Sequence, residues 1–323
     1  FSFKYTLLLH VYRVIMPKKK RGHVMYLFIV NLQSGNKNTL KNWAAIEKLL
    51  IDQHISFKKI MSHSQVKTEK FMSKHLLNPS DIKAVAVIGG DGTINSVIQQ
   101  LAATTIPLAV FPAGSGNDTA RMFQLTDNPK EFVLKMLAGK TTLIDLLNVN
   151  GRFGITVAGA GLDSIIGNQV NQSFYKSIFN KLGIGSFSYI IAAVITLLTF
   201  KPFNGKLTID GKVFPLTNAW LIACGNTAYY GGGLNICPHA LPSDGILNIT
   251  HLHNANRLNV LFRLFPHLLR GSPVTREGVF YNAGKEITLE TNRPIPAIVD
   301  GEITTSTPLH ITIREKALLL LLT

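Results

Sequence analysis

The stretch AVIGGDGTINSVIQQL, residues 86–101, joins a run of apolar residues to a helix-like segment through a glycine-rich turn. Its second half has apolar residues at the i, i+3, i+4, i+7 spacing of an amphipathic helix, namely Ile94, Val97, Ile98 and Leu101. A strand that leads through glycines into a helix is typical of parallel α/β sheets, and backbone N–H groups at such a helix start attract phosphate. The stretch therefore predicts a phosphate-binding turn.

The same alternation of strand-like and helix-like segments extends over residues 24–144. We expect strands at 24–30, 84–88 and 106–111 and helices at 40–50, 91–101 and 128–140. Strands that alternate with helices are joined by right-handed crossovers, so their carboxyl ends lie at one edge and form a ligand crevice there. Residues 24–144 are therefore predicted to be an α/β nucleotide-binding domain.

The pattern changes after residue 144. Asn150-Gly151 and Asp210-Gly211 are hairpin signals between β-rich runs, and further strands are expected at 219–225, 246–252, 286–290, 296–300 and 309–313. Helices are expected at 182–200 and near 257–270. Residues 145–323 are therefore predicted to form a larger antiparallel β-sandwich domain, which encloses a cleft with the first.

The chain is strongly basic, with 33 Lys and Arg against 18 Asp and Glu among 323 residues. This balance favours a polyanion or an anionic membrane surface as partner. No nucleic acid partner is expected, because no aromatic-rich basic stripe or known binding module occurs. The two cysteines, Cys224 and Cys237, form neither a metal-type pair nor a disulfide framework, which indicates a reducing cytosol.

Two apolar segments need to be tested as targeting or membrane signals. In residues 1–23 the basic run follows the apolar one, the reverse of a secretory signal, so we expect a non-native or disordered basic leader and a natural start at Met16 or Met25. Residues 182–200 carry no charge, but glycine and serine dominate their first half. A buried or interfacial helix fits this segment better than a membrane span.

Asp91 gives the first turn its chemistry. A carboxylate would repel phosphate unless a divalent cation lay between them, so Asp91 fits a metal-linked or proton-handling role. The alternative is a tight turn in which Asp91 only caps the helix. A second glycine-rich turn, PAGSGND at residues 112–118, follows the next strand. Neither turn is a Walker A or dinucleotide motif, but two phosphate-type turns at adjacent strand ends favour phosphate binding.

Taken in order, the motifs resemble the diacylglycerol kinase catalytic family, of the soluble bacterial lipid kinase type. The resemblance begins at residue 24 and includes GGDGTIN (89–95), PAGSGND (112–118), NLQSG (31–35), the glycine-rich segment 225–247 and VDGE (299–302). NAD kinases and phosphofructokinases share the GGDGT core, so a nucleotide-binding domain of their kind is implied. Leu32 stands at a usual proline, Ser96 at a usual glutamate and Ser115 at a common threonine.

The resemblance implies a set of site residues. ATP would be bound by Gly89, Gly90, Asp91, Gly92, Thr93, Ile94 and Asn95, with Asn31, Ser62, Gly114, Ser115, Asn117 and Asp118 lining the same cleft. Glu302 would be the general base, with Asp91 acting beside it or through a catalytic magnesium ion. Asp244 and the carbonyls of Leu241 and Ile246 would bind a structural Mg²⁺, and Asp145 would belong to an interdomain charge network.

We therefore expect an ATP- and Mg²⁺-dependent lipid kinase, with diacylglycerol as the first candidate substrate. It would be cytoplasmic and peripheral on the inner face of the plasma membrane, docked by the basic, apolar segment 246–285, whose arginines could equally form an ordinary exposed helix face. No obligatory protein partner is implied, and homodimer formation is left open. The alternatives are a kinase of a soluble substrate such as NAD, or a catalytically weak nucleotide-binding regulator.

Overall fold

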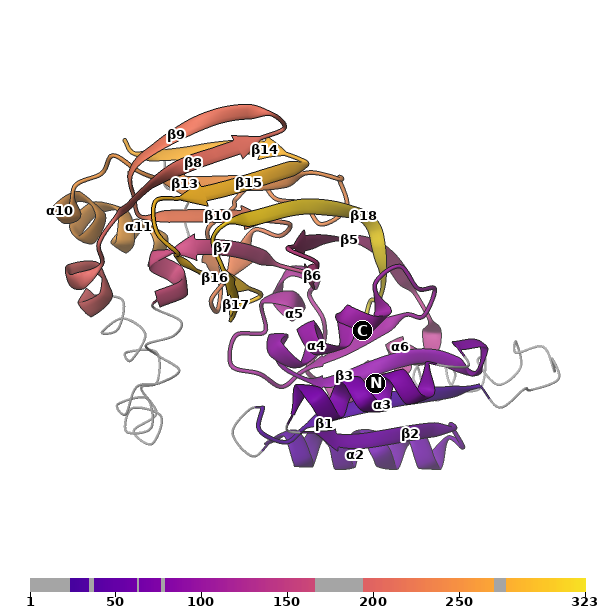
Figure 1. Cartoon of the computed structure of the whole chain (residues 1–323). Helices are drawn as coiled ribbons and strands as arrows, with labels where there is room; N and C mark the ends of the chain where they lie inside the picture. Colours follow the sequence, from indigo (N-terminus) through magenta and orange to yellow (C-terminus); the bar gives the residue numbers. More distant parts are fainter. Residues whose placement is uncertain (1–23, 35–37, 63, 77–78, 166–193, 270–276) are drawn as a thin grey trace.

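The computed structural model describes residues 24–34, 38–62, 64–76, 79–165, 194–269 and 277–323 (Figure 1). The predicted leader 1–23, the first part of the helix predicted at 182–200, and Arg270 and Arg276 lie outside these residues. Residues 194–199 are helical. Within the described ranges, every helix is too short or too polar to cross a bilayer.

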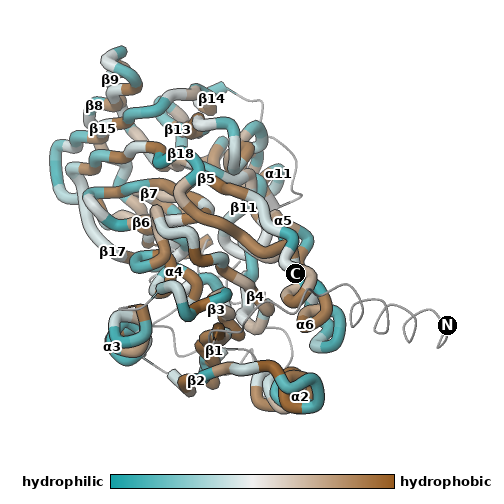
Figure 2. The backbone as a smooth tube through the Cα atoms, turned by 90° about the vertical axis from the view of Figure 1, so that its right-hand side faces the viewer, coloured by the Kyte–Doolittle hydropathy of each residue, from teal (hydrophilic) through white to brown (hydrophobic). Residues whose placement is uncertain are grey.

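The first half is built on a parallel sheet in the order β2–β1–β3–β4. Its strands are β1 (Met25–Asn31), β2 (Phe57–Ser62), β3 (Ile82–Gly89) and β4 (Leu108–Pro112). The central strands β1 and β3 are buried along almost their whole length, which explains their unbroken apolar sequences. Figure 2 shows this apolar centre in brown.

Helices cover both faces of this sheet. Helices α2 (Asn38–Asp52) and α6 (Pro129–Ala138) pack on one face, where Trp43 lies 5.2 Å from Phe28 and Phe132 lies 5.4 Å from Phe111, ring centre to ring centre. Helices α3 (Gln65–His75) and α4 (Asp91–Leu101) pack on the other. Leu40, near the start of α2, is 54% exposed, whereas Trp43, Ile46 and Leu50 are buried. The short helix α5 (Asp118–Phe123) follows β4.

The second half is an antiparallel sandwich of two sheets. One sheet holds β14, β13, β10, β7, β16 and β17 in that order. The other sheet continues the sheet of the first half with β18, β15, β8 and β9. Strand β5 also pairs with β18, and β6 pairs with β5. The bounds are β5 (Thr141–Val149), β6 (Arg152–Gly154), β7 (Val157–Gly161), β8 (Phe203–Ile209), β9 (Lys212–Ala219), β10 (Leu221–Gly225), β13 (Leu247–Leu252), β14 (Val279–Gly284), β15 (Glu286–Thr291), β16 (Pro296–Val299), β17 (Glu302–Ser306) and β18 (Leu309–Leu321).

Short elements connect these strands. The hairpin β11 (Tyr229–Tyr230) and β12 (Leu234–Asn235) precedes β13. Helix α10 (Arg257–Asn259), the π-helical turn η2 (Val260–Leu264) and α11 (Phe265–Leu269) form one helical segment after β13. The hairpins predicted at Asn150-Gly151 and Asp210-Gly211 are present, and both residues of each turn have positive φ, as a type I′ turn requires.

Strand β18 joins the two halves. Its first part pairs with β15 and β5, and near its end Leu320 pairs in parallel with Leu108 of β4. A ten-stranded sheet therefore runs through both halves, and in Figure 1 β18 descends from the sandwich to the α/β part. The boundary predicted at residues 144/145 falls within β5. The predicted fold class, an α/β first domain followed by an antiparallel sandwich, is confirmed.

Candidate active site

The predicted nucleotide-binding residues lie at the carboxyl edge of the parallel sheet. Strand β1 ends at Asn31, β2 at Ser62 and β3 at Gly89. Gly89 pairs in register with Pro112 at the end of β4, so the two glycine-rich turns leave neighbouring strands side by side. The edge is the place where parallel α/β sheets bind their ligands.

The two turns touch through backbone at Gly90 and Gly114. A Cβ on Gly90 would lie 2.9 Å from the Cα of Gly114, and a Cβ on Gly114 would lie 2.5 Å from the Cα of Gly90. Asn117, at φ 53°, closes the second turn: its Oδ1 accepts a hydrogen bond from the Gly114 N–H at 2.8 Å and its Nδ2 donates to the Gly114 carbonyl at 3.0 Å. Side chains at 90 or 114 would separate the turns.

The hydroxyl and amide groups at this edge differ in whether they already have hydrogen-bond partners within the protein. Asn31 Nδ2 donates to Thr93 Oγ1 at 2.8 Å, which ties the end of β1 to the start of α4. Ser62 is buried and accepts a hydrogen bond from the Thr68 hydroxyl at 2.9 Å. Ser115 is exposed at the tip of the second turn. Of the two predicted serines, Ser115 therefore has the side chain that is open to solvent.

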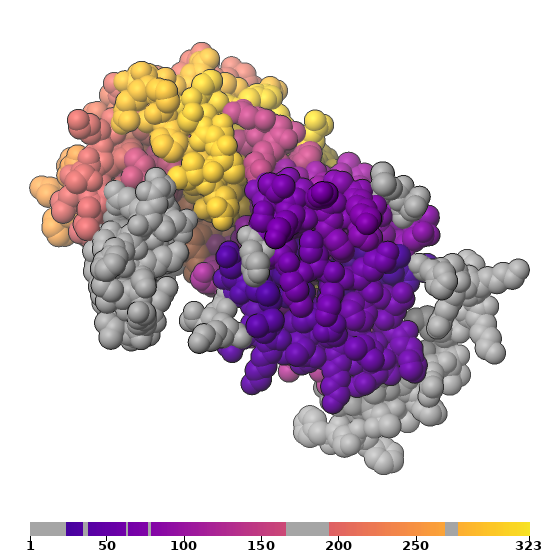
Figure 3. Space-filling view, turned by 60° about the horizontal axis from the view of Figure 1, so that its bottom comes forward, coloured from indigo at the N-terminus to yellow at the C-terminus, as the bar shows by residue number. Residues whose placement is uncertain are grey.

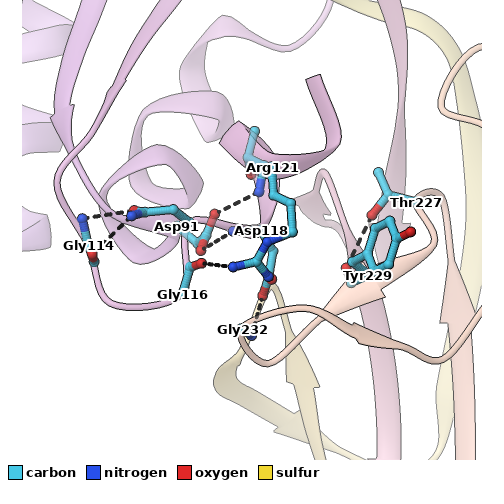
Figure 4. A network of polar contacts seen from close by, with 10 residues as sticks. Asp91, Gly114, Gly116, Asp118, Arg121, Thr227, Tyr229 and Gly232 are labelled. Carbon is cyan, nitrogen blue, oxygen red and sulfur yellow. Dashed lines mark hydrogen bonds and ion pairs between the residues drawn. The ribbon is translucent and has the colours of Figure 1, made fainter. Parts of the chain in front are cut away.

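Asp91 caps a helix, but not the one that it begins. Its Oδ2 accepts the backbone N–H of Asp118 at 3.1 Å and its Oδ1 accepts that of Thr119 at 3.2 Å. These are the first N–H groups of α5, which have no partner within the helix. The carboxylate of the first turn therefore fixes the helix that follows the second turn, as Figure 4 shows.

Asp118 extends this contact to the second half of the chain. Its Oδ2 accepts the N–H of Gly232, in the β11–β12 turn, at 2.9 Å, and its Oδ1 accepts from Arg121 at 3.2 Å (Figure 4). Burial raises the pKa of Asp118 above its ordinary value, and the charge of Asp91 adds to the rise. Asp118 therefore acts as a bridge between the α/β part and the sandwich.

Glu302 comes from the sandwich to the same edge. It begins β17 directly after the tight turn of Asp300 and Gly301, both at positive φ. A Cβ on Gly92 would lie only 2.8 Å from Glu302 Oε1. The carboxylate, which is exposed, therefore lies against the first turn of α4, one residue from Asp91. Glu302, 211 positions away in the chain, thus contacts the residue next to Asp91, while the Asp91 carboxylate itself is bonded to α5. Figure 3 shows the late strands in yellow against the purple α/β part.

Asp300 belongs to the VDGE motif, and the sequence alone assigned it no role, since an Asp-Gly pair fits a plain turn as well as a site. It is 8% exposed and accepts hydrogen bonds from the N–H groups of Ile155 and Thr156, from the Thr156 hydroxyl and from Asn95 Nδ2 at 2.8 Å. Burial raises its pKa. Asn95, in turn, accepts from Arg152 at 2.6 Å. Asn95 and Asp300 therefore hold α4 to the Glu302 hairpin.

Ser96 stands where a glutamate is usual in the family that the motifs resemble. It is buried in α4, and its hydroxyl donates to the Gly92 carbonyl at 3.0 Å. This is the back-bond to the residue four positions earlier that serine often makes in helices. The hydroxyl therefore stays within α4, beneath the residue that Glu302 contacts.

The residues predicted to bind a structural Mg²⁺ lie in the turn before β13. Asp244 is exposed, and its Oδ1 accepts the N–H of Ile246 at 3.0 Å. Oxygen donors of this kind suit Mg²⁺. No group of three or more Asp, Glu, His or Cys side chains gathers within the described part of the chain. One carboxylate and two carbonyls, those of Leu241 and Ile246, thus make up the candidate set, which stays a prediction.

Asp145 fixes this turn to the sheet. It is buried, and its carboxylate accepts the N–H groups of Gly245 at 2.8 Å and Lys316 at 2.6 Å. These bonds connect β5, β18 and the turn that carries Asp244. Asp145 therefore positions the candidate Mg²⁺ turn through backbone contacts.

An apolar cavity of about 70 Å³ lies between the six-stranded sheet and the helical segment 257–269. Its lining is almost entirely apolar and includes Leu162, Leu221, Leu252, Val260, Leu264 and Phe265. Such a cavity suits a hydrocarbon group better than a polar one.

Asp163 directly follows Leu162, which lines this cavity, and no sequence pattern pointed to it. It follows β7 and is buried, with Oδ1 accepting the Ser164 N–H at 2.8 Å. Its Oδ2 has no hydrogen-bond partner among the described residues. Burial raises the pKa of Asp163 to about 7. The carboxyl group is thus held in apolar surroundings beside Leu162, which lines the cavity.

Comparisons with known proteins identify the family of both halves of the chain. Residues 25–149 match the family described as "Diacylglycerol kinase catalytic domain", and residues 156–322 match "YegS C-terminal NAD kinase beta sandwich-like domain". A diacylglycerol kinase of Mycobacterium tuberculosis (strain ATCC 25618 / H37Rv) is 36% identical over 255 residues, which cover 76% of this chain and 80% of that protein. The same figures hold for the diacylglycerol kinase of strain CDC 1551 / Oshkosh.

A solved structure has the same fold. The crystal structure of a diacylglycerol kinase from Bacillus anthracis str. Sterne superimposes with a TM-score of 0.70 at 21% identity and covers 94% of this chain and 98% of that one. The sequence relatives and the two family matches lead to the same conclusion: the chain is a kinase and belongs to the diacylglycerol kinase catalytic family.

Proposed function

We propose that this kinase transfers the γ-phosphoryl group of ATP, in a Mg²⁺-dependent reaction, to the hydroxyl of a membrane lipid, with diacylglycerol as the first candidate. The observation that carries the proposal is the position of the Glu302 carboxylate against Gly92, at the start of the helix behind a bare, phosphate-type turn. An acid from a second domain is thereby available beside the expected phosphate position.

ATP would be held at the carboxyl edge of the parallel sheet. The backbone around Gly90 and Gly114 lets phosphates approach closely, and the start of α4 supplies N–H groups. Ser115 would donate its exposed hydroxyl. Bound Mg²⁺ would neutralise the charge of the phosphates, while residues of this chain orient the two reactants.

Glu302 is the better candidate for the general base. Both oxygens of Asp91 already accept backbone N–H groups of α5. Among the described residues, none donates a hydrogen bond to the Glu302 carboxylate. Glu302 is thus free to accept the proton of a lipid hydroxyl, which gives the oxygen its nucleophilic character as it attacks phosphorus. Asp91 would hold α5 and the second turn in position.

The apolar cavity supports a lipid substrate. It would take the hydrocarbon part of the acceptor, which a soluble acceptor such as NAD does not have. The basic composition of the chain fits work at an anionic surface, and we propose a peripheral location on the inner face of the plasma membrane.

The test is transfer of labelled γ-phosphate from Mg·ATP to diacylglycerol in mixed micelles with an anionic phospholipid. Wild type should form labelled phosphatidic acid, and Glu302→Gln should lower kcat by about 10²- to 10⁴-fold. Glu277→Gln, at an exposed glutamate, is the matched control and should keep full activity. Full activity of Glu302→Gln would remove Glu302 from the chemistry. No product on any of a panel of lipids, followed by phosphorylation of NAD or by binding of ATP without turnover, would overturn the proposal.

A further inference from the structure

The helical segment 257–269 has apolar side chains on both its inner and its outer side. Val260 and Leu264 are buried and line the apolar cavity. Leu258 and Phe262, which point away from it, are 67% and 69% exposed. Large apolar side chains exposed to this degree at four-residue spacing form an apolar stripe.

A second helical turn, residues 194–199, adds to this stripe. Leu197 is buried and lines the same cavity, whereas Ile195 and Leu198 are 42% and 54% exposed. Arg257 joins the two segments, because its guanidinium donates to the carbonyls of Leu197 and Phe200. In Figure 1 the salmon-coloured turn lies below α10 and α11. We call the exposed residues Ile195, Leu198, Leu258 and Phe262 the apolar face.

The charges on the two segments that carry the apolar face are of one sign. Neither residues 194–200 nor residues 257–269 contain an aspartate or a glutamate, and Arg263 is exposed beside Phe262. Apolar side chains together with cations match the interface of an anionic leaflet, where hydrocarbon lies beneath negative headgroups. A second copy of the chain would fit less well, since the same two segments of the partner would offer no aspartate or glutamate to pair with Arg263.

We propose that the apolar face inserts into the interfacial layer of an anionic phospholipid leaflet, with Arg263 at the headgroups. Because the inner sides of the same two helical segments line the cavity, docking would place that cavity next to the membrane. The significance of the cavity's position next to the membrane rests on the proposed lipid kinase function, whereas the docking of the apolar face does not.

The experiment is cosedimentation of the full chain with vesicles of phosphatidylcholine, with and without phosphatidylglycerol, in the absence of ATP. Wild type should bind the anionic vesicles. The double variant Leu258→Ser/Phe262→Ser should bind them about tenfold or more weakly, and Arg263→Gln about fivefold more weakly, with the loss confined to anionic vesicles. The matched control is Ile51→Ser/Val66→Ser, which changes residues 59% and 71% exposed on α2 and α3 and should bind like wild type.

The outcomes separate the docking face from the catalytic proposal. If wild type does not bind, if the double variant binds as wild type does, or if the control loses as much binding, the apolar face is not the docking surface. Sedimentation velocity of the same variants tests the other occupant, since a dimer lost only in Leu258→Ser/Phe262→Ser with vesicle binding retained would assign the face to a second copy. Suppose that the double variant Leu258→Ser/Phe262→Ser loses vesicle binding and that the wild type binds vesicles but phosphorylates no lipid. This result would uphold the docking face and overturn the lipid kinase proposal.

Discussion

Glu302 lies against Gly92 so closely that a Cβ at position 92 would be 2.8 Å from Glu302 Oε1. This close approach connects the two halves of the chain at the start of α4. A larger side chain at position 92 would therefore displace the Glu302 carboxylate while leaving Glu302 itself unchanged.

Gly92→Ala should displace the Glu302 carboxylate while leaving the fold intact. Its φ is outside the left-handed region, so alanine fits the backbone and α4 gains helix propensity. We expect kcat for lipid phosphorylation to fall on the order of 10²-fold, because misplacement by about 1 Å can cost that much. Thermal unfolding of the variant should match wild type within a few degrees. Unchanged kcat would mean that Glu302 is not held by this contact.

Asp300→Ala should lower the stability of the protein strongly, because the Asp300 carboxylate accepts several buried hydrogen bonds. The change leaves buried donors without an acceptor, among them the N–H groups of Ile155 and Thr156 and the amide of Asn95. We expect the free energy of unfolding to fall by about 3 kcal/mol or more, measured by urea unfolding. Asp210→Ala, at a turn aspartate whose bonds are exposed, is the control and should cost less. Equal losses would mean that burial of Asp300 adds nothing.

Some features of the fold and the site could be predicted from the sequence, and others could not. The strand–turn–helix rhythm predicted the α/β part, and the Asn-Gly and Asp-Gly dipeptides predicted the hairpins. Only the resemblance to the kinase family implied that Asp91 and Glu302 belong to one site. Asp300 could not be distinguished from a plain turn residue, since its partners at 95, 155 and 156 lie far away in the chain. Likewise, β18 adds to the first sheet through pairing with β4, and no local pattern encodes such a long-range pairing.

Asp91 was expected to act on a ligand or to cap its own helix, and its bonds to α5 suggest a substitution series that separates the two roles. Asp91→Ala removes the acceptor for the N–H groups of Asp118 and Thr119, so the free energy of unfolding should fall by about 1 kcal/mol. Asp91→Asn keeps an acceptor oxygen without the charge and should lose less stability. If the charge also serves the reaction, kcat will fall in both variants; wild-type kcat in Asp91→Asn would limit Asp91 to capping.

Asp163 should make the stability of the protein depend on pH. Burial raises its pKa from an ordinary 3.8 to about 7, so between these values the native state holds a proton that the unfolded chain has released. Stability from this group is therefore highest in acid and falls as pH rises toward 7, by at most about 4 kcal/mol over the whole range, of which about 2.5 kcal/mol falls between pH 5 and pH 8. Asp163→Asn carries no charge and should show less of this fall. Urea unfolding at pH 5 and pH 8 measures it, with the exposed Asp52→Asn as control. A wild type and an Asp163→Asn variant whose stabilities change in parallel between the two pH values would show that Asp163 ionises in the native state as easily as it does in the unfolded chain.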